Sequence, residues 1–420
     1  MGLAGWGIWV FCQQASATIC LFESFTQSAF MRLLIQVKDN QSSEAYKKLI
    51  WLGLLSFCSQ GVLIFLIHLG LATTLPRFFP NFENTSTSGL ILIMGFSALI
   101  NQMGKINGQL LYAHQQQDVA AVAATTGLLV NLLVVLTFLP TYPNPQTMGW
   151  GFLAGSVSSQ VLYWIFVKRR DYYPFFADFP IFQWVDFQGL FFWGRKFFLV
   201  SFLNNLSGSL PTLLAGRFLS LELVGVWGVL QRIGNLASQL LLKIPQLAIP
   251  ALMEMHARGE EQRFRKRSQQ LLWMQNVLAG IFLGIFAGAG DFLLSLWISM
   301  ATPIPGLILC IFALGLLADF DQRLRFDLEA TRFQLNRPTL ASFIKIASTL
   351  LCVPLCSVVY GLSGMVAALS AIYALLVLPL AFVNKPFRDS YSLTATPTIA
   401  GLSVFLFFYF LLLWMRSFVL

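Results

Sequence analysis

The chain has 420 residues, of which 57% are hydrophobic and only 11% are charged, whereas about a quarter of the residues in an ordinary soluble domain are charged. A helix that crosses a bilayer needs about 20 apolar residues, so this composition suffices for roughly ten to twelve such helices. It excludes a soluble enzyme, a secreted disulfide scaffold and a disordered tail. It predicts an all-α polytopic membrane protein.

The net charge of +9 does not indicate nucleic-acid binding, because the 27 Lys and Arg residues gather in short loops between apolar runs. The six Cys residues are scattered and form no C-x-x-C motif, so the sequence predicts neither a disulfide framework nor a zinc site. The three His residues, His68, His114 and His256, are far apart in the sequence. We expect no metal and no cofactor.

Apolar runs interrupted by charge, Pro and Gly predict twelve membrane spans. They cover residues 5–33, 49–74, 89–113, 118–140, 148–167, 189–215, 221–251, 268–297, 305–325, 338–360, 362–383 and 395–416.

The loops between these spans differ sharply in charge. Eighteen Lys and Arg residues fall in one alternate set of loops, at 32–48, 168–170, 258–267, 323–337 and 385–388. The opposite set contains three, Arg77, Arg217 and Arg416. The positive-inside rule places the first set in the cytoplasm, so both termini face outward. An outward N-terminus is unusual without a cleavable signal, and none precedes Glu23. We therefore expect that a first helix is missing in front of this sequence.

Two parts of the chain resemble each other at shifts of 220, 217 and 213 residues. The paired segments are Leu3–Gly7 with Leu223–Gly228, Leu111–Ala113 with Leu328–Ala330, and Gly149–Ala154 with Leu362–Ala367. This repeat predicts two pseudo-symmetric parallel lobes around a central cavity, the architecture of a transporter. We expect an N-terminal lobe at 1–170, an interfacial connector at 171–188, a C-terminal lobe at 189–384 and an extra helix at 385–420.

Polar side chains form stripes inside the predicted spans. In the seventh span, Arg232, Asn235, Gln239, Lys243 and Gln246 recur at helical spacing and line one face over about 21 Å. The equivalent stripe of the first span carries Gln13, Ser16, Cys20, Ser24 and Gln27, and that of the third carries Ser97, Asn101, Lys105, Gly108, Gln109 and Tyr112.

Six cations lie within the predicted spans: Lys105, Arg195, Lys196, Arg232, Lys243 and Lys345. Charges inside a bilayer are costly and usually functional, so we expect these six to face a shared, water-filled interior. Pairing between helices is the alternative for the uncharged polar residues. A net-positive interior favours an anionic cargo such as phosphate. Arg32 completes the predicted binding set with Arg232, Asn235, Gln239, Lys243, Lys105, Asn101 and Lys196, while Glu23 is the candidate for ion coupling.

Several short motifs resemble polysaccharide exporters. They are Val224–Trp227, Arg232–Ile233, Pro245, Pro250 and Ala257–Glu260, together with Gly5–Trp9 and Tyr360–Gly364. The pattern is similar to the lipid-linked oligosaccharide flippases of the multidrug/oligosaccharidyl-lipid/polysaccharide (MOP) exporter superfamily. The resemblance covers essentially the whole chain and implies two six-helix lobes, of which this chain lacks the first helix.

The resemblance implies a bacterial inner-membrane flippase, and no catalytic residue. Its cargo would be a polyprenyl-pyrophosphate-linked sugar for O-antigen (lipopolysaccharide), capsule or exopolysaccharide, and its partners would be membrane lipids and a polysaccharide polymerase. Two alternatives remain open: a cation-coupled drug exporter of the same superfamily, and a membrane glycosyltransferase or polymerase acting on lipid-linked sugars. The exporter would need acidic residues in its lobes, and the enzyme would need catalytic groups on a sizeable loop.

Overall fold

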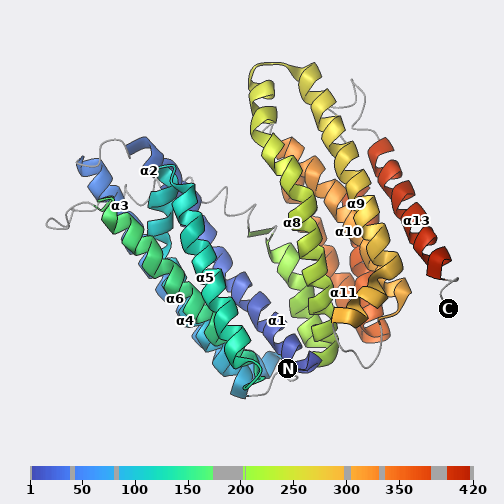
Figure 1. The fold of residues 1–420 in the computed structure, drawn as a ribbon, viewed down its shortest axis with the longest axis horizontal. Coiled ribbons are helices and arrows are strands. Elements are labelled where there is room, and N and C mark those ends of the chain that lie inside the picture. The colour runs from blue at the N-terminus through green and yellow to red at the C-terminus, as the bar shows by residue number, and fades with distance from the viewer. Residues whose placement is uncertain are drawn as a thin grey trace. The chain divides into compact units, whose positions relative to one another are not determined.

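The computed structural model describes residues 2–37, 43–79, 85–173, 202–203, 205–297, 304–330, 336–379 and 395–416. Within these ranges all regular structure is helical and no strand occurs (Figure 1). The chain divides into two compact units, Met1–Val226 and Trp227–Leu420. The predicted lobe limits, 1–170 and 189–384, stay a prediction.

The first unit is a helical bundle. Its helices are α1 (Leu3–Ile19), the 3-10 turn η1 (Cys20–Glu23), α2 (Ser24–Val37), α3 (Glu44–Phe78), α4 (Thr85–Ala113), α5 (Gln117–Phe138) and α6 (Pro145–Arg169). Residues 205–218 are also helical, and α8 (Leu221–Ala257) begins in this unit.

Local sequence signals explain several of these boundaries. The Ser43 hydroxyl accepts a hydrogen bond from the Tyr46 amide and caps α3, and Asn144 caps α6 in front of Pro145, as expected for these residue types. The predicted first span is interrupted at η1. Shortly before it, the Thr18 hydroxyl donates to the Gln14 carbonyl at 2.8 Å, a bond that tends to bend helices.

Close helix packing in the first unit depends on glycine. A Cβ on Gly127 of α5 would lie 2.7 Å from the Gly155 carbonyl oxygen of α6, so the two backbones touch. At the end of the bundle, the Tyr46 hydroxyl donates to the Tyr172 carbonyl at 2.7 Å. The Tyr173 hydroxyl donates to Asn107. Burial raises the pKa of Tyr173, which follows the last turn of α6, so this phenol remains a donor at physiological pH.

The second unit contains the remainder of α8 and the later helices. They are α9 (Glu261–Trp297), α10 (Gly306–Ala330), α11 (Asn336–Ala371), the π-helical segment η3 (Ile372–Val377) and α13 (Thr396–Arg416). Gly361 interrupts α11 with φ 58°, a conformation that glycine adopts without steric cost. The break falls between the predicted spans 338–360 and 362–383.

Helix α13 packs closely on α9 along a run of small residues. A Cβ on Gly284 would lie 2.7 Å from the Phe405 carbonyl oxygen, and one on Gly288 would lie 2.9 Å from the Leu412 Cβ. Gly280 faces Gly401 in the same way. Small residues at four-residue spacing permit this approach between membrane helices.

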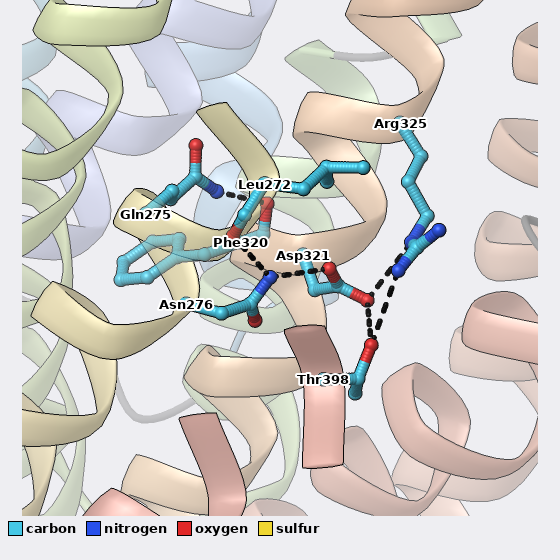
Figure 2. Close-up of polar contacts among 7 residues, drawn as sticks. All are labelled: Leu272, Gln275, Asn276, Phe320, Asp321, Arg325 and Thr398. Atoms are coloured by element: carbon cyan, nitrogen blue, oxygen red, sulfur yellow. Dashed lines mark hydrogen bonds and ion pairs between the residues drawn. The ribbon is translucent and has the colours of Figure 1, made fainter. Parts of the chain in front are cut away.

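A buried polar network joins α9, α10 and α13 (Figure 2). Asp321 receives hydrogen bonds from Arg325 at 3.0 Å, Asn276 at 2.7 Å and Thr398 at 2.9 Å. Arg325 also donates to the Thr398 hydroxyl at 3.2 Å. Since Asp321 and Arg325 are both fully buried, these bonds replace the water that the two charges have lost.

Seven helices of the described chain are long and apolar enough to cross a membrane. Their outward faces are apolar, as Leu128 and Leu133 on α5 illustrate with 69% and 63% exposure, because the surrounding solvent is lipid. The predicted spans overlap helices wherever the structure describes them, with the first interrupted at η1, and 189–215 lies mostly outside the described residues. The all-α polytopic membrane fold is therefore confirmed.

Candidate functional site

A cavity of about 640 Å³ lies inside the first unit. Four helical elements, α1, α4, α6 and the helix at 205–218, surround it together with η1 and α2. Its polar and aromatic lining residues are Trp9, Gln13, Gln14, Ser16, Cys20, Gln27, Asn101, Lys105, Gln109, Tyr112, Phe152, Gln160, Tyr163, Asn205 and Ser209. The cavity is therefore rich in amides and aromatic rings, the side chains that suit a polar organic ligand.

Two predicted stripes meet in this cavity. Gln13, Ser16, Cys20 and Gln27 contribute from the first span. Asn101, Lys105, Gly108, Gln109 and Tyr112 contribute from α4. Helical spacing brings each set onto one face, and the packing of α1 against α4 brings the two faces together. The binding roles predicted for Asn101 and Lys105 stay predictions.

A hydrogen-bond network fixes the α4 wall of the cavity. Asn101 Nδ2 donates to Ser156 Oγ at 2.9 Å, and Asn101 Oδ1 accepts from Gln160 Nε2 at 3.3 Å. Ser156 Oγ also shares a 2.6 Å bond with Ser97. Ser97 is buried behind the wall and is absent from the lining. Because both ends of the Asn101 amide are engaged, its orientation is set before a ligand enters.

Polar atoms of two lining residues lack a partner among the described residues. Trp9 Nε1 and Gln160 Oε1 are buried without a hydrogen bond, although Trp9 is only 5% exposed. Buried polar atoms in native proteins normally have a partner. Since both atoms have essentially no accessible surface, they lie behind the cavity wall and do not face its open space. Lys105 is the one charged residue in the described lining.

The other predicted site residues lie elsewhere. Arg232, Asn235 and Gln239 are exposed on a single face of α8 in the second unit, as their spacing predicts. The side chains of Lys243, Arg32 and Glu23, and the whole of Lys196, lie outside the described residues.

The expectation for Lys345 is wrong. Its Nζ lies 3.0 Å from Asp319 Oδ1, and both groups are buried. The same carboxylate pairs with Arg323 at 2.8 Å, and the ammonium lies 4.2 Å from the centre of the Tyr373 ring. Lys345 is thus neutralised within the helix packing, and it is not a cation of the open interior.

The sequence pattern did not indicate several of the lining residues. Trp9 sits in an apolar run, while Phe152 and Tyr163 look like ordinary membrane aromatics. Gln160 was detectable in principle, because it is a polar residue within the apolar α6. Across the described ranges, no group of three or more His, Cys, Asp or Glu side chains could hold a metal ion.

Comparisons with known proteins agree on family and fold. Residues 11–289 match the family model described as "Polysaccharide biosynthesis protein". No curated protein matches the chain by sequence.

Solved structures share the architecture at low sequence identity. A multidrug resistance MATE family transporter of the MOP superfamily, in an inward-facing conformation, superposes with a TM-score of 0.71 at 13% identity over 99% of this chain and 94% of that one. The lipid II flippase MurJ, in an inward closed conformation, superposes with a TM-score of 0.69 at 13% identity over 100% of this chain and 97% of that one. A MOP superfamily transporter from Pyrococcus furiosus superposes with a TM-score of 0.59 at 13% identity over 97% of this chain and 87% of that one.

Proposed function

Because the chain belongs to the polysaccharide biosynthesis protein family, we propose that it flips a polyprenyl-pyrophosphate-linked oligosaccharide. The cargo would pass from the cytoplasmic to the outer leaflet of the bacterial inner membrane, where a polymerase would use it for O-antigen, capsule or exopolysaccharide. Two lobes at 1–170 and 189–384 would alternate access, as parallel repeats allow. The protein would be a transporter and not an enzyme.

The lining of the 640 Å³ cavity carries this proposal. A sugar hydroxyl both donates and accepts hydrogen bonds, so it can pair with the polar groups that line the cavity. Trp9, Tyr112 and Tyr163 offer apolar ring surface to the C–H face of a sugar. The amides of Gln14 and Gln27, which also line the cavity, add further donors and acceptors without adding charge.

The cations would hold the pyrophosphate. Lys105 lines the cavity one helical turn from Asn101, and its ammonium group can form charge-assisted hydrogen bonds to phosphate oxygens. The α8 face with Arg232, Asn235, Gln239 and Lys243 would add further contacts, as would Lys196 and Arg32. The lipid tail would remain in the bilayer while the head group moves.

Export of organic cations is the second candidate, because MATE transporters share the fold. The cavity argues against it. A site for cations is expected to contain carboxylates, whereas the charged residue of the described lining is a lysine.

Proteoliposomes test the proposal directly. A polyprenyl-pyrophosphate-linked disaccharide is reconstituted in both leaflets, and periodate, which does not cross the membrane, oxidises only outward sugars. With the wild-type protein we expect the oxidised fraction to rise from about half to nearly all. Loss of one charge-assisted hydrogen-bonding group costs about 1.5–3 kcal/mol, so Lys105→Gln should weaken cargo binding roughly 10-fold to 150-fold.

Lys168→Gln is the matched control. Lys168 lies in the last turn of α6 with its Nζ 5.0 Å from the centre of the Trp164 ring, and it is absent from the cavity lining. The control should flip normally. If periodate still oxidises only about half of the sugar in liposomes with the wild-type protein, the sugar is not flipped. That result, together with efflux of an organic cation such as ethidium, would favour the exporter instead.

A further inference from the structure

His68 is a titratable side chain that is buried inside a membrane helix. It lies on α3 within the candidate span Glu44–Leu75 and is 0% exposed. Ionisable residues within membrane spans are rare and usually functional, and histidine is the side chain whose charge most readily changes with pH in the physiological range. The function proposed above assigns this residue no task.

The contacts of the ring define its protonation. Nδ1 lies 2.8 Å from the Ile64 carbonyl oxygen, and Nε2 lies 2.8 Å from Ser16 Oγ. A carbonyl oxygen can only accept, so Nδ1 carries the hydrogen and donates it. In the neutral ring Nε2 is then the acceptor, and the Ser16 hydroxyl donates to it.

Ser16 connects this ring to the cavity, because it is one of the lining residues. While His68 is neutral, the Ser16 hydrogen points to the ring, and the Ser16 oxygen offers only lone pairs to a ligand. If Ser16 passes its hydroxyl proton to Nε2 and takes another proton from cavity water, the new N–H donates to Ser16 Oγ. The hydroxyl hydrogen is then released toward the cavity, and a positive charge lies 2.8 Å behind it.

The elements packed around His68 supply little competing charge. Helix α1 has no charged residue, and α4 approaches so closely that a Cβ on Gly95 would lie 2.6 Å from the His68 Cβ. The charged residue of α4, Lys105, is ten positions from Gly95, about 15 Å along the helix. The other titratable or charged groups on the surrounding elements are Cys12, Cys20, Glu23, Arg32, Tyr112 and, on α3 itself, Glu44, Tyr46, Lys47, Lys48, Cys58 and Arg77.

We infer that His68 is a proton-binding site whose occupancy, relayed by the Ser16 hydroxyl, raises the affinity of the cavity for the anionic part of its ligand. This inference rests on the proposed function, because it takes the cavity as the cargo site. Coupling is reciprocal, so an anion in the cavity favours protonation of His68.

Nuclear magnetic resonance of nitrogen-labelled histidine tests the site without any cargo. The chain has three His residues, so His114→Asn and His256→Asn assign the His68 signals in the purified full chain. At high pH we expect the tautomer with hydrogen on Nδ1. On acidification the ring should become doubly protonated, and sulfate should raise the midpoint pH. Sulfate is the probe because its charge is constant between pH 5 and 8.

Affinity for sulfate gives the second readout. Cys20 lines the cavity, and in a variant with the other five cysteines replaced, sulfate should slow its alkylation by a maleimide. At each pH, the sulfate concentration that halves the alkylation rate is measured relative to the rate without sulfate at that same pH. The effect of pH on ionisation of the thiol then cancels, and the half-inhibiting concentrations can be compared between pH values. We expect at least about fivefold tighter binding at pH 5.5 than at pH 7.5. His68→Asn and Ser16→Ala should each reduce this ratio to less than twofold.

His114→Asn is the matched control, because His114 Nδ1 makes the same bond to the carbonyl four residues earlier, at 2.9 Å. Its ring stacks on Tyr172 and does not line the cavity. This variant should keep the wild-type ratio. A His68 ring that stays neutral to pH 5 with and without sulfate, or a wild-type ratio in His68→Asn, would overturn the inference. Neither result depends on whether lipid-linked sugar is flipped.

Discussion

Removing the negative charge of the Figure 2 network should destabilise the second unit strongly. Asp321→Asn retains the size of the side chain but deprives Arg325, which is 1% exposed, of the carboxylate that pairs with it at 3.0 Å. Loss of one partner of a buried ion pair costs about 3–5 kcal/mol. For a unit of this size, 1 kcal/mol corresponds to roughly 2–4 °C, so the melting temperature should fall by roughly 6–20 °C.

The assay is size-exclusion chromatography of the detergent-solubilised protein after heating, with the monodisperse peak as the signal. Asp291→Asn is the control, because Asp291 lies near the end of α9 and its carboxylate accepts a hydrogen bond from the Phe292 amide. Its effect should stay within about 0.5 kcal/mol. If both variants melt within about 2 °C of the wild type, the network contributes nothing and the reasoning fails.

Three further outcomes are expected. Gly284→Leu should separate α13 from α9, since even a Cβ would lie 2.7 Å from the Phe405 carbonyl oxygen. The cost of overpacking, about 1–3 kcal/mol, should lower the same melting temperature. An unchanged melting temperature would contradict the close packing of these two helices. Arg232→Ala should abolish surface glycan in cells while the protein still inserts into the membrane. Normal surface glycan in that strain would argue against a role for Arg232 in cargo binding. Glu23→Gln should alter the dependence of flipping on ion gradients; transport equal to wild type under every gradient would remove Glu23 from the coupling scheme.

The sequence predicted the helices well because apolar length is a direct physical requirement of the bilayer. The span expected at 118–140 corresponds to α5 at Gln117–Phe138, and the break expected after residue 360 is the left-handed Gly361. The break at Cys20–Glu23 was not predicted, because no Pro or Gly marks it. It follows a side-chain bond of Thr18 to the backbone, which composition does not reveal.

The candidate site was predictable only in part. Helical spacing brought out the stripes on α1 and α4, since a stripe is a property of one helix. Which charge faces which partner depends on contacts between helices. Lys345 therefore looked like a cavity cation although Asp319, 26 residues earlier, neutralises it, and Trp9 and Gln160 were missed because their unsatisfied atoms exist only after folding.

The position of Thr398 on the last helix also has a consequence for biosynthesis. Helix α13 leaves the ribosome after every other part of the network has entered the membrane. Until it arrives, the glycine groove of α9 remains open and Asp321 lacks one of its hydrogen-bond donors. A chain that stops before residue 396 would thus keep Asp321 buried with one hydrogen-bond donor fewer and leave the glycines of α9 uncovered.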